Sequence, residues 1–173
     1  GDVTLAFKVY GKSASELTPD DLKVVHEKKM HVIFVRDDVT GYQHLHPEYD
    51  NGRWTIKTRI PDPGTYEMYV DIAPNVESVV VLRLPLIIGE TTVKKMYPNI
   101  SRDRAEVADG IQAKVTSTES FSEGQIAKFA FTLTKGNQTV SSIAPYLGAY
   151  GHVIIMRHGD ADHYVHAHPV SNS

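Results

Sequence analysis

Two stretches of this chain repeat one another, and the repeat constrains the fold more than any other feature of the sequence. Residues 30–47 read MHVIFVRDDVTGYQHLHP, and residues 151–169 read GHVIIMRHGDADHYVHAHP. The similarity extends upstream, because LAFKVYGK at residues 5–12 parallels FAFTLTKG at residues 129–136. A repeat of this kind within 173 residues predicts two copies of one structural module.

Both copies consist of short runs of β-branched and aromatic residues, separated by turn formers such as Pro61-Asp-Pro-Gly. One helical turn is expected at Thr18-Pro-Asp-Asp, where a capping residue precedes proline and two acids. Short strands at this spacing predict an all-β fold, and we expect two repeated β-sandwich modules of immunoglobulin-like or cupredoxin-like type. The expected strands are Val3–Tyr10, Lys23–His26, Met30–Arg36, Tyr42–His46, Trp54–Ile60, Thr65–Ile72, Ser78–Ile88, Ile111–Thr118, Gln125–Thr134, Thr139–Ile143, His152–Arg157 and Tyr164–His168.

A polar and charged segment divides the chain. We expect a first module at residues 1–90, a linker at residues 91–109 and a second module at residues 110–173. The copies do not match over their full lengths. The counterpart of strand 111–118 would precede Gly1, and counterparts of the strands within residues 54–88 would follow Ser173. Each module is therefore expected to be incomplete at one end. A further stretch of chain, the opposite terminus or another chain would complete it by strand addition.

Composition narrows the function classes. The chain has no cysteine, which excludes disulfides, thiolate metal sites and cysteine nucleophiles and slightly favours an exported protein. A net charge of −3 without a block of like charge argues against nucleic-acid binding. The longest apolar stretch, residues 79–88, contains Arg83 and Pro85 and is too short to span a membrane. Histidine is the exception, because there are nine and six of them match between the copies.

Each copy is expected to form a hairpin that brings three histidines together. In the first hairpin His31 lies opposite His46, and the period-two alternation of a strand places His44 on the same face. Opposed Cβ atoms lie about 5 Å apart and diagonal ones about 7–8 Å, which is close enough for three imidazoles to bind one ion. The equivalent residues of the second copy are His152, His166 and His168.

This pairing leaves hairpin loops at residues 37–40 and 158–162, both of ordinary length. Asp37 and Asp38 lie in the first loop and are expected to be solvated turn residues rather than catalytic acids. His158 lies in the second loop, and we expect it and His163 to be turn residues as well.

Imidazole nitrogen is the preferred neutral ligand of zinc, copper, nickel and iron, and three imidazoles leave one coordination position open. The two triads therefore predict a pair of sites, one in each module, for copper or zinc. His26 lies just ahead of the first hairpin and is a candidate fourth ligand. Its aligned partner is Leu147, so the second site would differ. Met30 and Met156 are expected to be core residues.

Two alternatives stay open for these side chains. Histidines on strands also serve as packed polar residues that hydrogen-bond loops, and duplication alone could preserve them. Asp71 is either a metal ligand, a residue that orients a ligand, or a turn residue, and its place near a strand end favours the turn.

The runs HEKKMHVIFVRDD, YQHLHPE, PGTYEMYVD and PYLGAYGH with HAHP resemble exported bacterial tandem β-sandwich proteins with His-x-His-Pro hairpins. That family is similar to extracytoplasmic proteins associated with copper or other heavy metals. The resemblance covers most of the chain. It implies a metal-handling β-sandwich that is periplasmic, secreted or on the cell surface, and it implies no particular reaction.

Three functions fit these features. The first is a metal buffer, chaperone or resistance factor, whose partners are a metal ion and either another copy of itself or a metal-handling protein. The second is a cupin-like metalloenzyme, but Glu48 follows His46 too closely for a cupin and no general base is evident. The third is an immunoglobulin-like structural or adhesion module with incidental histidines. We predict the first, and no enzyme activity.

Overall fold

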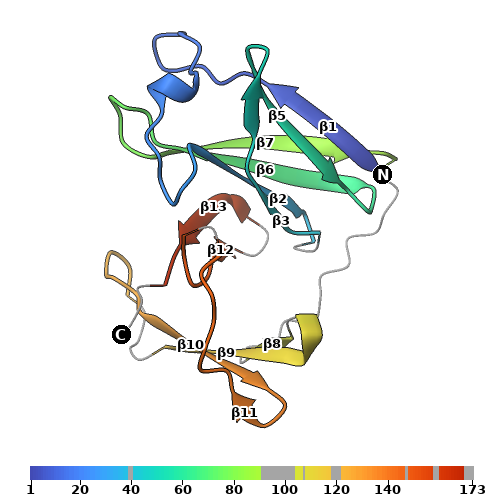
Figure 1. Ribbon diagram of the computed structural model, residues 1–173, viewed down its shortest axis with the longest axis vertical. Helices are drawn as coiled ribbons and strands as arrows, with labels where there is room; N and C mark the ends of the chain where they lie inside the picture. Colours follow the sequence, from blue (N-terminus) through green and yellow to red (C-terminus); the bar gives the residue numbers. More distant parts are fainter. Residues whose placement is uncertain are drawn as a thin grey trace. The chain divides into compact units, whose positions relative to one another are not determined.

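The structure of the protein is a computed structural model, which describes residues 1–38, 41–90, 104–106, 108–117, 122–146, 148–157 and 160–169. It is built from antiparallel strands, so the prediction of an all-β, sandwich-like fold is confirmed. The only helical turns in these ranges are the 3-10 segments η1 (Pro19–Asp21) and η2 (Ala108–Gly110). The chain forms two compact units, one of residues 1–98 with 146–173 and one of residues 99–145 (Figure 1).

The first unit contains a β-sandwich made of two sheets (Figure 1). One sheet has the order β1-β5-β4, with β1 (Asp2–Phe7), β5 (Arg53–Arg59) and β4 (Glu48–Asp50). The other has the order β3-β2-β6-β7, with β3 (Gln43–Leu45), β2 (Met30–Arg36), β6 (Gly64–Ile72) and β7 (Val80–Ile88).

The main core lies between these two sheets. Side chains of a strand alternate between its faces, so Met30, Val32 and Phe34 of β2 all point inward, and each is at most 2% exposed. They pack in one cluster with Trp54 and Ile56 of β5. Burial of each large apolar side chain contributes about 1.5–3 kcal/mol. The prediction that Met30 is a core residue is thus confirmed.

A second hairpin covers the other face of β2. It consists of β12 (Val153–Arg157) and β13 (Asp160–Ala167) and belongs to the same compact unit. Tyr69 of β6 and Tyr164 of β13 stack with ring centroids 4.2 Å apart and planes inclined by 10°. The cluster at this contact consists of Ile33, Val35, Tyr69, Ile154, Met156 and Tyr164. Because β2 is buried on both faces, residues 32–35 are apolar at every position rather than at alternate positions.

The predicted helical turn is confirmed as η1. Its first turn is capped by Thr18 and Asp21, since Asp21 Oδ2 accepts hydrogen bonds from the Thr18 backbone nitrogen at 2.8 Å and from Thr18 Oγ1 at 2.7 Å. The strand expected at Lys23–His26 is wrong. Val25 instead pairs with Lys28 across a tight turn, whose central residues have positive φ angles.

The second unit contains a four-stranded antiparallel sheet of order β11-β10-β9-β8. Its strands are β8 (Arg104–Glu106), β9 (Ile111–Ser117), β10 (Phe129–Lys135) and β11 (Gln138–Thr139). β8 falls inside the expected linker, so this part of residues 91–109 is a paired strand. Residues 91–103 and 107 of the linker lie outside the described residues.

The repeat and the compact units divide the chain differently. The expected second module, residues 110–173, contributes its strands β9 to β11 to one unit and its hairpin β12–β13 to the other. The physical reason is the apolar cluster around Tyr69, which holds the hairpin of the second copy against the sheet of the first.

Candidate metal centre

Both histidine hairpins have the predicted register. The ladder between β2 and β3 pairs Val32 with Leu45, and its continuation places His31 opposite His46. The ladder between β12 and β13 pairs Val153 with Ala167, and its continuation places His152 opposite His168. The alternation of side chains along a strand therefore directs the three histidines of each copy to one face.

The turn of the second hairpin differs from the prediction. Arg157 pairs with Asp160 through a register shift, so β13 begins inside the expected loop of residues 158–162. Residues 158 and 159, and with them the expected turn residue His158, lie outside the described residues. His163 is an exposed residue of β13 rather than a turn residue.

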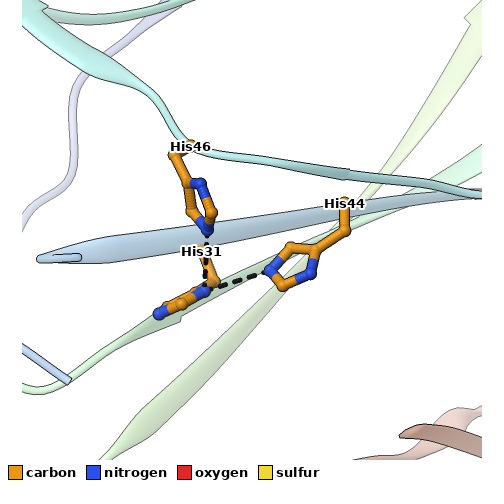
Figure 2. A group of neighbouring side chains, drawn as sticks. All are labelled: His31, His44 and His46. Carbon is orange, nitrogen blue, oxygen red and sulfur yellow. Dashed lines mark hydrogen bonds between the residues drawn. The ribbon is translucent and has the colours of Figure 1, made fainter. Parts of the chain in front are cut away.

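His31 lies at the centre of the first triad (Figure 2). Its Nδ1 is 3.0 Å from His44 Nε2 and 3.1 Å from His46 Nε2. His31 is 4% exposed on β2, while the other two are partly buried on β3 and just after it. The ligand atoms of the three residues all lie within 4.8 Å of one another, so the structure brings the first predicted triad together.

A backbone carbonyl determines which nitrogen of His31 carries the proton. His31 Nε2 lies 2.9 Å from the carbonyl oxygen of Val25. A carbonyl only accepts, so Nε2 donates, and Nδ1 of the neutral ring presents a lone pair to the other two imidazoles. Val25 and Lys28 exchange backbone hydrogen bonds of 2.8 and 3.2 Å, which hold this carbonyl in place. Metal-binding histidines usually donate their second N–H in this way.

His152 has the same arrangement in the second copy. Its Nε2 donates to the carbonyl oxygen of Tyr146 at 2.9 Å. Its Nδ1 lies 3.0 Å from His168 Nε2 and 3.5 Å from His166 Nε2. Tyr146 and Ala149 exchange backbone hydrogen bonds of 2.8 and 3.2 Å, as Val25 and Lys28 do. The second predicted triad is therefore connected through His152.

The two triads adjoin one another. The ring centroid of His44 lies 4.7 Å from that of His152 and 5.3 Å from that of His166. These three residues form a second group whose ligand atoms lie within 4.8 Å of one another, and it takes one histidine from the first hairpin and two from the second. The sequence predicts one site in each module, whereas the structure places both triads in a single cluster. No spacing of histidines within either hairpin predicts this contact.

His26 lies at the edge of this cluster. Its ring centroid is 3.7 Å from that of His168 and 6.3 Å from that of His31. His26 has a φ of 48° because it occupies the turn that holds the Val25 carbonyl. The candidate fourth ligand of the first triad thus lies nearer to a histidine of the second.

The turn role that the sequence favours for Asp71 is wrong, whereas the alternative of a residue that orients a histidine fits its position. Asp71 lies in β6 opposite His31, not in a turn. Asp71 Oδ2 accepts from His166 Nδ1 at 3.1 Å, and the two side chains are 14% and 5% exposed. His166 Nε2 is then free to bind. Among the described residues, Asp71 Oδ1 and the Tyr164 hydroxyl have no hydrogen-bond partner. The uninterrupted apolar run of β2 is the signal that another element covers this face.

Burial lowers the pKa of four of the clustered histidines and so favours their neutral form. It lowers the pKa of His44 to about 3, with help from the neighbouring His152 and His46. Burial also lowers the pKa of His46 to about 4 and that of His168 to about 4, and it lowers the pKa of His31. The neutral ring is the form that could bind a metal ion, because its lone pair is then available.

The chain belongs to a family described as a domain of unknown function (DUF8832), whose model matches residues 1–83 and 105–173. The first matched segment contains the hairpin β2–β3, and the second contains the hairpin β12–β13. Comparison with curated proteins and with solved structures found no match. Within the described residues, no helix has the length and apolar character needed to cross a membrane.

Proposed function

We propose that this member of a family of unknown function binds divalent copper or zinc through its clustered histidines. In this proposal it is an extracytoplasmic metal buffer, chaperone or resistance factor. The observation that carries the proposal is the convergence of His44 Nε2 and His46 Nε2 on His31 Nδ1, at 3.0 and 3.1 Å.

These spacings fit shared coordination. Two nitrogens bound to one ion at about 2.0–2.1 Å lie about 3 Å apart at the right angles of a tetragonal Cu(II) site and about 3.4 Å apart in a tetrahedral zinc site. A single lone pair on His31 is a poor acceptor for two donors at once, so a hydrogen-bonded network explains the arrangement less well than an ion between the three rings. The convergence of the rings also supports metal binding over an adhesion module, in which nothing would align the three lone pairs.

The donor set favours particular metals. It contains imidazole and no thiolate, which suits Cu(II) and Zn(II), and copper has the higher intrinsic affinity for such ligands. Met30 packs in the main core and Met156 in the cluster around Tyr69, so both thioethers make apolar contacts. This argues against a site dedicated to Cu(I).

The test is titration of EDTA-treated protein with Cu(II) and with Zn(II), followed by calorimetry and by metal analysis of the desalted protein. We expect micromolar or tighter binding by the native chain and loss of the first site in the double variant His44→Ala/His46→Ala. His163→Ala is the matched control, because it removes an exposed histidine from β13 and should bind as the native protein does. Binding that is unchanged in the double variant would exclude the first triad.

A further inference from the structure

We propose that the two hairpins hold a pair of metal ions in one dinuclear centre, with His44 serving both ions. This inference rests on the proposed function and specifies its site. The juxtaposition that carries it is that His44 belongs to two groups of converging ligand atoms, one centred on His31 and one containing His152 and His166.

The number of ions follows from the two carbonyl-bound histidines. His31 and His152 each have Nε2 occupied by a backbone carbonyl at 2.9 Å, so each offers a single lone pair, on Nδ1. One lone pair binds one ion. His31 faces His44 and His46, while His152 faces His166 and His168 at 3.5 and 3.0 Å. Each therefore has its own set of partners, and the cluster has places for two ions.

The shared role of His44 follows from its position. Its Nε2 lies 3.0 Å from His31 Nδ1, on the side of the first ion. Its ring also lies against His152 and His166, with centroids 4.7 and 5.3 Å away. A neutral imidazole has one N–H group and one lone pair. When the N–H proton is lost as well, each of the two nitrogens can bind an ion. The ring proton of His44 would be released to solvent as the second ion binds.

Two dications bound to the same imidazole repel one another. A buried carboxylate, that of Asp71, contacts the second triad and offsets part of this repulsion. The Asp71 carboxylate accepts from His166 Nδ1 and is 14% exposed, so its charge is only weakly screened. It also holds His166 with Nε2 toward His152. Asp71 also lies opposite His31 in the ladder between β2 and β6, but its hydrogen bond goes to His166 of the second triad. The ion at His152 therefore depends on Asp71 more than the ion at His31 does.

The experiment is a Cu(II) titration of the full chain, read by metal content and by electron paramagnetic resonance. We expect two Cu(II) ions per chain, with reduced integrated signal or a half-field transition that shows the ions interact. His46→Ala and His168→Ala should each retain one ion with an ordinary isolated-copper spectrum. His44→Ala should weaken both ions, each by tenfold or more. His163→Ala is the control and should match the native chain.

The outcomes separate this inference from the proposed function. If the native chain binds no copper, the proposed function itself fails. If it binds one ion, or two with isolated spectra, the metal-binding function stands and the dinuclear centre is wrong. If His44→Ala keeps both affinities, His44 is not shared. Circular dichroism and thermal unfolding of each metal-free variant confirm folding, and His44→Gln replaces His44→Ala if the alanine variant does not fold.

Discussion

The imidazole of His31 is constrained at both of its nitrogens, by a carbonyl at Nε2 and by two imidazoles at Nδ1. Replacement by alanine removes the Nδ1 atom that faces both His44 and His46. We expect His31→Ala to lower the affinity for the first ion by more than about 100-fold, since even loss of an outer partner costs 10–100-fold. Calorimetric titration with Zn(II) measures this. An affinity within threefold of the native value would contradict the assignment.

In the proposed centre Asp71 acts on the second ion through His166 and is a positioning residue. Asp71→Asn keeps the shape but removes the negative charge, so we expect the affinity of the second ion to fall by about 10–100-fold. The first ion should lose less affinity than the second, because Asp71 lies opposite His31 but hydrogen-bonds His166, and a merely structural role would not predict this difference. Metal analysis in a His46→Ala background isolates the second ion. Glu67→Gln, which alters another acid of β6 whose partner is Arg83, is the control.

The docking of hairpin β12–β13 on β6 depends on the stack of Tyr164 on Tyr69. Tyr164→Ala removes one ring of the pair and exposes the other, so we expect a loss of about 2–4 kcal/mol in the free energy of unfolding. Urea denaturation measures it. Val165→Ala, on the adjacent position that is 54% exposed, should change stability by no more than about 0.5 kcal/mol.

Removal of the Tyr164 hydroxyl alone, by Tyr164→Phe, is not expected to lower the free energy of unfolding. The hydroxyl is buried, without a hydrogen-bond partner among the described residues, and burial raises its pKa. A buried unsatisfied hydroxyl is destabilising by about 1–3 kcal/mol, so its removal should leave stability unchanged or raise it. A clear loss of stability in the same urea experiment would mean that the hydroxyl has a partner in solution.

The first hairpin is stabilised by an ion pair at its tip. Arg36 donates from Nε and from an NH2 group to the two carboxylate oxygens of Asp38 at 2.9 and 2.8 Å, and Asp38 is 4% exposed. The expectation that Asp38 is a solvated turn residue is therefore wrong. Asp38→Ala removes the nearer of two acids that pair with Arg36, since Asp62 lies 3.6 Å away, and we expect a loss of about 1.5–3 kcal/mol. Asp50→Ala, at an exposed strand end, is the control in thermal unfolding.

The whole molecule should lose stability in acid when it is free of metal. Burial gives His44, His46 and His168 pKa values of about 3, 4 and 4, below the ordinary value of about 6.5 that they regain on unfolding. Between these values the unfolded chain binds more protons, so stability rises with pH up to about 6.5 and then levels off. Thermal unfolding of EDTA-treated protein from pH 4.5 to 8 measures this. The variant in which His44, His46 and His168 are all replaced by glutamine should show a weaker dependence of stability on pH. An unchanged slope would contradict the role of these three histidines.

What the sequence predicts correctly is local. The pairing of His31 with His46, and of His152 with His168, follows from alternation within single hairpins, and the repeat supports both. One error arises where distant segments meet, and the other two arise where local polar residues are paired or buried. Asp71 is read as a turn residue because its partner, His166, lies 95 residues away. The paired strand β8 is missed because its polar residues resemble a linker, and the burial of Asp38 depends on the side chain of Arg36.

The position of hairpin β12–β13 has a consequence for the order of events during synthesis. The first compact unit is interrupted by residues 99–145, so its last element leaves the ribosome after the whole of the second unit. A nascent chain that has reached residue 98 contains His31, His44 and His46, but it has neither the ring that covers Tyr69 nor the partners of Asp71. Domains fold as they emerge, from the N-terminus onward. The first triad then lacks its covering hairpin until His168 has been synthesised, and the cluster closes only after the second unit has left the ribosome.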